Sequence, residues 1–146
     1  MRILGIDFGL KRVGLALTDP METMAFPHRT LVRSTRDALF SELLTIIEAE
    51  AVEEIVVGLP LNLDGSDSMT TRQARNFAQS LGRRTPLPLH LVDERLSSVA
   101  AEEELIAAGM KKYNKRKAVL DQQSAVRILE TWLTQRNRPG QREPQA

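Results

Sequence analysis

The stretch Arg2–Thr18, RILGIDFGLKRVGLALT, holds two mostly apolar runs separated by a short turn. Arg2–Phe8 and Val13–Thr18 each have the length and composition of a β-strand. Gly9–Arg12 between them supplies the glycine and charged residues that turns favour. The pattern predicts a β-hairpin at the start of the fold.

The residues after the hairpin predict a third strand and then a helix. Phe26–Val32 is the strand, and Pro27 favours an edge position because proline cannot donate to a ladder of hydrogen bonds. Ser34 and Asp37 resemble a capping box. The apolar residues that follow recur at helical spacing: Leu39, Phe40, Leu43, Leu44, Ile46 and Ile47.

The later part of the chain alternates between strand and helix patterns. Strands are expected at Glu54–Gly58 and Leu87–Val92. Helices are expected at Ala74–Gly82, at Ser97–Gly109 and from about Ala118 to Arg136. Such alternation implies parallel strands joined by right-handed crossovers. The sequence therefore predicts an α/β fold, a five-stranded mixed sheet whose first three strands are antiparallel and whose later strands are parallel, flanked by helices.

Length and composition indicate one domain of an ordinary globular protein. We expect it to span residues 1–136, and we expect the Pro-, Gly-, Gln- and Arg-rich tail 137–146 to be disordered. No apolar run approaches the roughly 20 residues of a membrane span, and Arg2 and Asp7 interrupt the stretch that a signal peptide would need. A cytoplasmic protein with no membrane partner is expected.

The cysteine count and the net charge restrict the kinds of functional site that the chain can form. The chain has no cysteine, which excludes disulfides, thiolate metal sites and a cysteine nucleophile. Its net charge is only +1, so binding to nucleic acid would have to rely on a local basic patch. A metal ion would have to be held by carboxylates or histidines.

Three acidic residues stand at positions where chemistry is expected. Asp7 lies among apolar neighbours near the end of the first strand, where a buried charge needs a cation, either an arginine or a metal ion. Glu94 follows the fifth strand, at the edge where open α/β sheets bind ligands. Side chains alternate along a strand, so one of Asp93 and Glu94 can face Asp7; Glu94 is preferred, and pairing with Arg95 is the structural alternative. Asp121 is placed at the start of the last helix, where the helix dipole alone would explain it.

Together these carboxylates could converge on hard divalent cations, which prefer oxygen ligands. Two such ions about 4 Å apart activate a water and stabilise the departing oxygen of a phosphodiester. This chemistry requires neither cysteine nor histidine. The hypothesis is a nuclease in which Asp7, Glu94 and Asp121 are both the catalytic residues and the ligands of Mg²⁺ or Mn²⁺.

Candidate substrate contacts fall in three places. The hairpin turn offers Gly9, Lys11 and Arg12, and the loop after the fourth strand, together with the segment after the fifth, offers Asn62, Asp64 and Arg95. The third place is a basic stretch that could follow a nucleic-acid backbone: Lys111, Lys112, Lys115, Arg116 and Lys117. A solvent-exposed turn or loop is the alternative interpretation in each case.

Four motifs occur in order: GIDFGLKRVG at 5–14, GLPLNLDG at 58–65, DERLS at 93–97 and DQQSA at 121–125. Together they resemble the YqgF family, also called RuvX, of Holliday-junction resolvases and pre-16S ribosomal RNA nucleases. The resemblance covers Arg2 to Leu133.

This resemblance implies a ribonuclease H-like fold and a metal-dependent endonuclease that processes the 5′ end of precursor 16S ribosomal RNA in ribosome biogenesis. It places the acidic triad on Asp7, Glu94 and Asp121. The partners it implies are precursor ribosomal RNA, ribosomal particles or branched DNA, and the expected state is a monomer or weak homodimer.

Three alternatives stay open at this point. Asp7-Phe8-Gly9 followed by Val13-Gly14 also resembles the phosphate-binding hairpin of sugar kinases and actin-like ATPases, although those enzymes need two such domains. A four-way DNA junction resolvase would share the chemistry and normally act as a symmetric dimer. A non-catalytic RNA-binding factor of ribosome assembly would bind RNA without metal-dependent cleavage.

Overall fold

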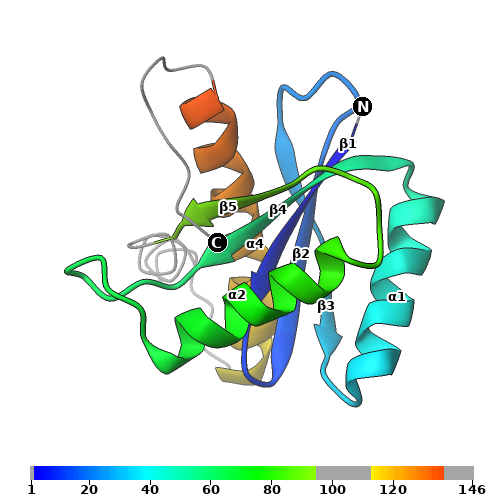
Figure 1. The fold of residues 1–146 in the computed structure, drawn as a ribbon. Coiled ribbons are helices and arrows are strands. Elements are labelled where there is room, and N and C mark those ends of the chain that lie inside the picture. The colour runs from blue at the N-terminus through cyan, green and yellow to red at the C-terminus, as the bar shows by residue number, and fades with distance from the viewer. Residues whose placement is uncertain (1, 95–112, 137–146) are drawn as a thin grey trace.

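The computed structural model describes residues 2–94 and 113–136 (Figure 1). The elements in chain order are β1 (Arg2–Phe8), β2 (Arg12–Thr18), β3 (Ala25–Val32), α1 (Arg36–Ala49), β4 (Val52–Leu59), α2 (Met69–Gly82), β5 (Leu89–Asp93) and α4 (Tyr113–Arg136). The helix expected at 97–109 and the tail 137–146 lie outside the described residues. No helix within the described ranges is both long and apolar enough to cross a bilayer.

The five strands form one mixed sheet in the order β3-β2-β1-β4-β5. β1 pairs with β2, and β2 with β3, in antiparallel register. β4 is parallel to both β1 and β5, and α2 makes the crossover between β4 and β5. The predicted sheet, with its antiparallel hairpin strands and parallel later strands, is confirmed. β3 lies at an edge, as Pro27 indicated, and the register shifts beside that proline.

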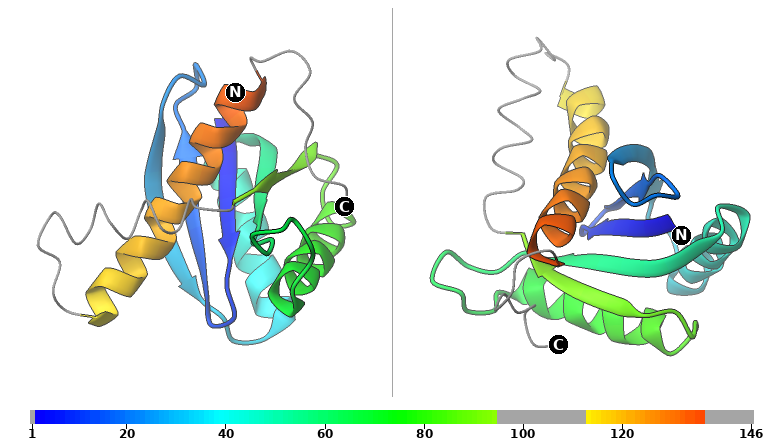
Figure 2. Two further views of the ribbon diagram at one scale, coloured as in Figure 1. Left: turned by 90° about the vertical axis from the view of Figure 1, so that its left-hand side faces the viewer. Right: turned by 90° about the horizontal axis from the view of Figure 1, so that it is seen from above.

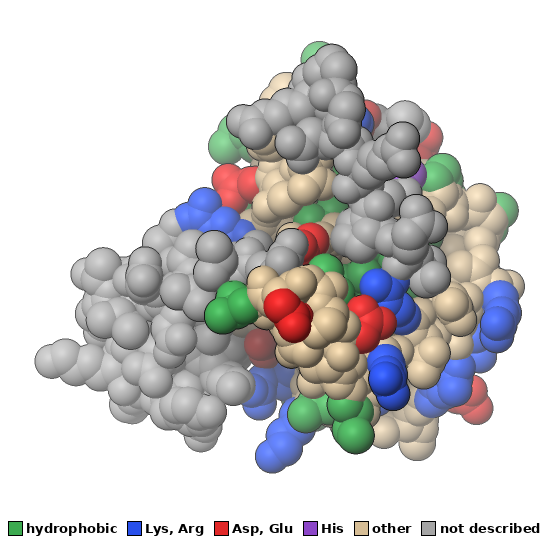
Figure 3. All heavy atoms as spheres, turned by 60° about the vertical axis from the view of Figure 1, so that its left-hand side comes forward, with side chains coloured by type: hydrophobic (Ala, Val, Ile, Leu, Met, Phe, Trp, Pro, Cys, Tyr) green, Lys and Arg blue, Asp and Glu red, His purple; other side chains and the backbone are tan. Residues whose placement is uncertain are grey.

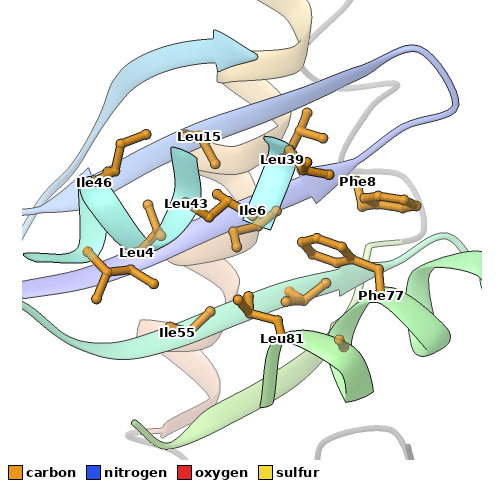
Figure 4. Close-up of a cluster of buried hydrophobic side chains, with 14 of the residues drawn as sticks. Leu4, Ile6, Phe8, Leu15, Leu39, Leu43, Ile46, Ile55, Phe77 and Leu81 are labelled. Atoms are coloured by element: carbon orange, nitrogen blue, oxygen red, sulfur yellow. The ribbon is translucent and has the colours of Figure 1, made fainter. Parts of the chain in front are cut away.

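Helices cover both faces of the sheet: α1 and α2 lie on one face and α4 crosses the other (Figure 2). Strand alternation sends Leu4, Ile6 and Phe8 into the core under α1 and α2 (Figure 4), whereas Ile3 packs with α4. Burying each such side chain contributes about 1.5–3 kcal/mol. Asp7 follows Ile3 by four residues in the same strand, so its side chain lies on the same face of the sheet, under α4.

The helix starts are set by side-chain caps. Thr35, not Ser34, caps α1 and accepts a hydrogen bond from the Ala38 backbone N–H, so the predicted Ser34 capping box is wrong by one position. Both residues have a hydroxyl, and only the backbone direction selects between them. Ser68 and Thr71 form a complete capping box on α2.

The start of the last helix differs from the prediction. α4 begins at Tyr113 rather than near Ala118, so Lys115, Arg116 and Lys117 lie in the helix and Asp121 lies well inside it. The interpretation of that stretch as a loop rested on its charge. Lysine and arginine are good helix formers, and neither glycine nor proline interrupts the run. The helix dipole therefore does not account for Asp121.

Candidate active site

The fold brings the three predicted acidic residues to one region at the carboxyl end of β1, β4 and β5. Asp7 is on the α4 face of β1, and Glu94 follows β5 directly, where its backbone N–H donates to the Leu59 carbonyl at 3.1 Å. The Glu94 side chain is buried. Asp121 reaches the region from α4, which packs across β2.

Two glycines make this approach sterically feasible. A Cβ on Gly14 of β2 would overlap the Asp121 backbone carbonyl, and a Cβ on Gly58 of β4 would overlap Glu94 Oε2. Both glycines lie inside strands. A glycine within a strand often marks a close approach of another group, and that property could have indicated their role.

The buried carboxyl groups of Asp7 and Glu94 lie close enough for each to raise or lower the pKa of the other. Burial, with the nearby charge of Asp121, raises the pKa of Asp7 to about 7. Burial and then the charge of Asp7 raise the pKa of Glu94 well above its ordinary value. It is Glu94, not Asp93, that meets Asp7. The pair is an acidic centre that a proton or a cation must neutralise.

The third carboxylate is already paired. Arg12 Nε donates to Asp121 Oδ2 at 2.8 Å, and both side chains are mostly buried. The arginine partner considered for Asp7 is thus found at Asp121 instead. Sequence reasoning missed this contact because it gave Arg12 to a substrate phosphate.

The donor set fits a hard cation in part. Within the described residues Glu94 Oε2 is buried without a hydrogen-bond partner, and the available ligands are carboxylate oxygens, which Mg²⁺ and Mn²⁺ prefer. As the side chains stand, however, no three histidine, cysteine, aspartate or glutamate residues in the described ranges are grouped closely enough to hold a metal ion. Asp121 would have to leave Arg12 to complete a three-carboxylate site.

The other candidate contacts are distributed around this region. Gly9 closes the hairpin turn by donating to the Arg12 carbonyl at 2.9 Å, and Lys11 is exposed beside it. Asn62 and Asp64 both bond to Ser66 within the β4–α2 loop, so they shape that loop. Figure 3 shows the face that carries this loop, with Lys and Arg side chains mostly in its lower half.

The basic stretch is divided by the limit of the described residues. Lys115, Arg116 and Lys117 are in the first turns of α4. Arg95, Lys111 and Lys112 lie outside the described residues.

Comparison with known proteins gives the family. A family model described as "RuvX: Holliday junction resolvase" matches residues 1–135 of this chain. The chain belongs to the RuvX family. Among RuvX relatives, a protein of Maridesulfovibrio salexigens named "Putative pre-16S rRNA nuclease" is 64% identical over 91% of this chain and 98% of its own length. A relative of the same name from Oleidesulfovibrio alaskensis is 53% identical over 91% and 92%.

Solved structures agree on the fold of this RuvX chain. T. thermophilus RuvC in complex with a Holliday junction substrate has a TM-score of 0.58 at 14% identity, covering 92% of this chain and 96% of that one. The fowlpox virus resolvase with Holliday junction DNA has a TM-score of 0.57 at 8% identity, covering 94% and 100%. The ribonuclease H-like fold and the predicted family are therefore confirmed, and family membership supports nuclease activity.

The pKa of Asp7 leads to a prediction about pH. Between its ordinary value of 3.8 and its folded value of about 7, the folded protein binds more protons than the unfolded chain, so stability falls as the pH rises through this range. We expect the Tm in EDTA to drop between about pH 4 and pH 7 and the drop to be smaller in Asp7→Asn. Parallel Tm curves for the two proteins would contradict this assignment.

Proposed function

We propose that this chain is a divalent-metal-dependent endonuclease that processes the 5′ end of precursor 16S ribosomal RNA. The observation that carries the proposal is the buried acidic pair of Asp7 and Glu94, with Asp121 beside it, at the sheet edge where α/β proteins bind ligands. Such a cluster costs folding free energy unless a cation offsets its charge. A structural role alone would not favour it.

Asp7, Glu94 and Asp121 are the residues that would hold Mg²⁺ or Mn²⁺, as a pair of ions. When bound, these ions supply a Lewis acid that activates water and stabilises the departing oxygen of the phosphodiester. Arg12 neutralises Asp121 in their absence. If Asp121 served as a metal ligand, the Arg12 guanidinium at the same edge would be free to contact a substrate phosphate.

RNA is proposed as the substrate because of the names of the relatives. Proteins that share up to 64% identity with nearly the whole of this chain are named pre-16S rRNA nucleases. The family description and the resolvase complexes favour a second substrate, a four-way DNA junction, which a symmetric dimer would cut on two strands. A monomer or weak homodimer is proposed for the RNA reaction, with ribosomal particles as partners and the cytoplasm as location.

One experiment separates these functions. The full chain is incubated in parallel with precursor 16S ribosomal RNA and with a four-way DNA junction, each with Mg²⁺, with Mn²⁺ and with EDTA. We expect endonucleolytic cleavage near the mature 5′ end of the RNA in either metal ion and none in EDTA. Cleavage of the junction alone would establish the resolvase. RNA binding with no metal-dependent cut would establish the non-catalytic factor.

The basic stretch is expected to bind the RNA backbone. Replacing Lys111, Lys112 and Lys115 by alanine should weaken RNA binding and reduce the slope of log affinity against log salt by about 0.7 for each single-strand phosphate that the variant no longer neutralises. Fluorescence anisotropy over a salt series measures this. Arg83→Ala at the far end of α2 is the control, and we expect it to leave the slope unchanged. A triple variant with the wild-type slope would refute the proposed role of the stretch.

A further inference from the structure

A second candidate binding site lies across the sheet from the acidic pair. It is a cavity of about 380 Å³ between the end of β1, the start of α1 and the middle of α2. Phe8 forms part of its wall and stacks on Phe77 of α2, with ring centroids 4.3 Å apart (Figure 4). Asp7 is the adjacent residue in β1. The cavity and the acidic pair therefore lie on opposite faces of one strand end.

The cavity carries positive charge, and among the described residues no acidic side chain lines it. The Arg33 guanidinium lies 4.5 Å above the Phe8 ring and donates through Nη1 to the carbonyls of Gly9 and Leu10, at 3.1 and 2.9 Å. These contacts hold the guanidinium plane at the hairpin turn. Within the described part of the chain its other nitrogens make no hydrogen bond, so their donors are available to a ligand.

A second arginine is held in a similar way. Arg36, the first residue of α1, lies with its guanidinium over the Phe40 ring at 5.7 Å and donates to the Ser80 hydroxyl. Ser34 and the cap residue Thr35 add hydroxyl groups at this rim of the cavity. Thr35 already accepts from the Ala38 N–H, which leaves the N–H groups of Arg36 and Asp37 at this helix start to favour an anion such as phosphate.

The opposite wall carries side-chain amides. Gln73 and Asn76 are three residues apart on α2, so they share a helix face, and both line the cavity. An amide both donates and accepts, and this combination matches the edge of a nucleobase. Protein sites that recognise unpaired bases combine such hydrogen bonds with stacking on aromatic rings or arginine planes.

We propose that this cavity binds one unpaired nucleotide of the RNA strand that is cut at the acidic pair. The proposal rests on the nuclease function proposed above, and it specifies the substrate as single-stranded next to the cleaved bond. The phosphate lies near Arg33 and Arg36, and the base lies against Gln73 and Asn76. The volume is that of a small-ligand site, and hydrogen bonds from Gln73 and Asn76 need a base edge that is not already paired.

The test measures binding rather than cleavage. The full chain with Asp7→Asn, in EDTA, is titrated into a labelled single-stranded RNA and into the same RNA annealed to its complement, and anisotropy is recorded. Asn76→Leu in this background should weaken single-strand binding about tenfold and leave duplex binding unchanged. Gln79→Leu is the matched control, because Gln79 is an exposed amide on the same helix that does not line the cavity, and we expect it to bind as the parent does.

A second measurement protects against variants that fold poorly. Adding a nucleoside monophosphate to the parent chain should shift the NMR side-chain amide signals of Gln73 and Asn76, but not that of Gln79. Equal weakening by Asn76→Leu and Gln79→Leu, or no selective shift, would overturn the proposal. Neither measurement involves metal or cleavage. A wrong binding site would therefore appear as a loss of selective binding, whereas a wrong nuclease proposal would appear as RNA that is bound in the cavity but not cut.

Discussion

Asp7→Asn and Glu94→Gln are each expected to lower Mg²⁺- or Mn²⁺-dependent cleavage at least about a thousandfold, because each removes a ligand charge from the proposed metal site. Both substitutions keep the shape of the side chain, and Asp7→Asn removes a buried charge that opposes folding. The fold should therefore persist. Single-turnover cleavage of precursor ribosomal RNA measures the first effect, and circular dichroism measures the second.

Asp93→Asn is the matched control for this pair. Asp93 is adjacent to Glu94, but it is the buried carboxyl group of Glu94 that interacts with Asp7. We expect Asp93→Asn to cleave within a fewfold of the wild type. Full activity in both Asp7→Asn and Glu94→Gln would refute the metal site. Reduced cleavage in Asp93→Asn alone would identify Asp93, not Glu94, as the second metal ligand.

Gly14→Ala should have the largest effect on stability. The new Cβ would overlap the backbone carbonyl of Asp121, and a helix backbone cannot move aside as a flexible side chain does. Overpacking of this kind typically costs about 1–3 kcal/mol of unfolding free energy, and we expect the upper end of that range or more. Urea unfolding in EDTA measures it. RNA cleavage should fall as well, since α4 carries Asp121.

Gly82→Ala is the control for Gly14→Ala. Gly82 ends α2, and a Cβ there meets no atom of the described residues within 4 Å. Alanine loses less conformational entropy than glycine on entering a helix, so this variant should be stabilised by up to about 1 kcal/mol. Wild-type stability in Gly14→Ala would show that α4 does not pack on β2 as described.

Sequence patterns were sufficient for elements whose cause is local. Alternating apolar runs and turn residues predicted β1 and β2, and helical periodicity predicted α1 and α2. The boundaries were less accurate where neighbouring residues compete. Ser34 and Thr35 are both good caps, and the basic run before Asp121 is compatible with a loop or a helix.

In the site, too, local sequence indicates candidate residues, and tertiary packing decides which groups they contact. The sequence indicated Asp7 as a charge among apolar neighbours and Glu94 as an acid at a ligand-binding edge, whereas Asp121 became a candidate only together with these two. Their surroundings depend on groups distant in the chain. Arg12 meets Asp121, Gly58 admits Glu94, and Gly14 admits α4 only after the sheet and helices have packed.

By itself the sequence determined the strands, most of the helices, the mixed sheet and the acidic residues, since periodicity, turn chemistry and charge act over a few residues. Only the tertiary structure decided that Glu94 rather than Asp93 faces Asp7, that Asp121 is paired with Arg12, and that Phe8 opens onto a basic cavity. The reason is physical. Close packing between segments far apart in the chain selects one of several locally equivalent side-chain arrangements.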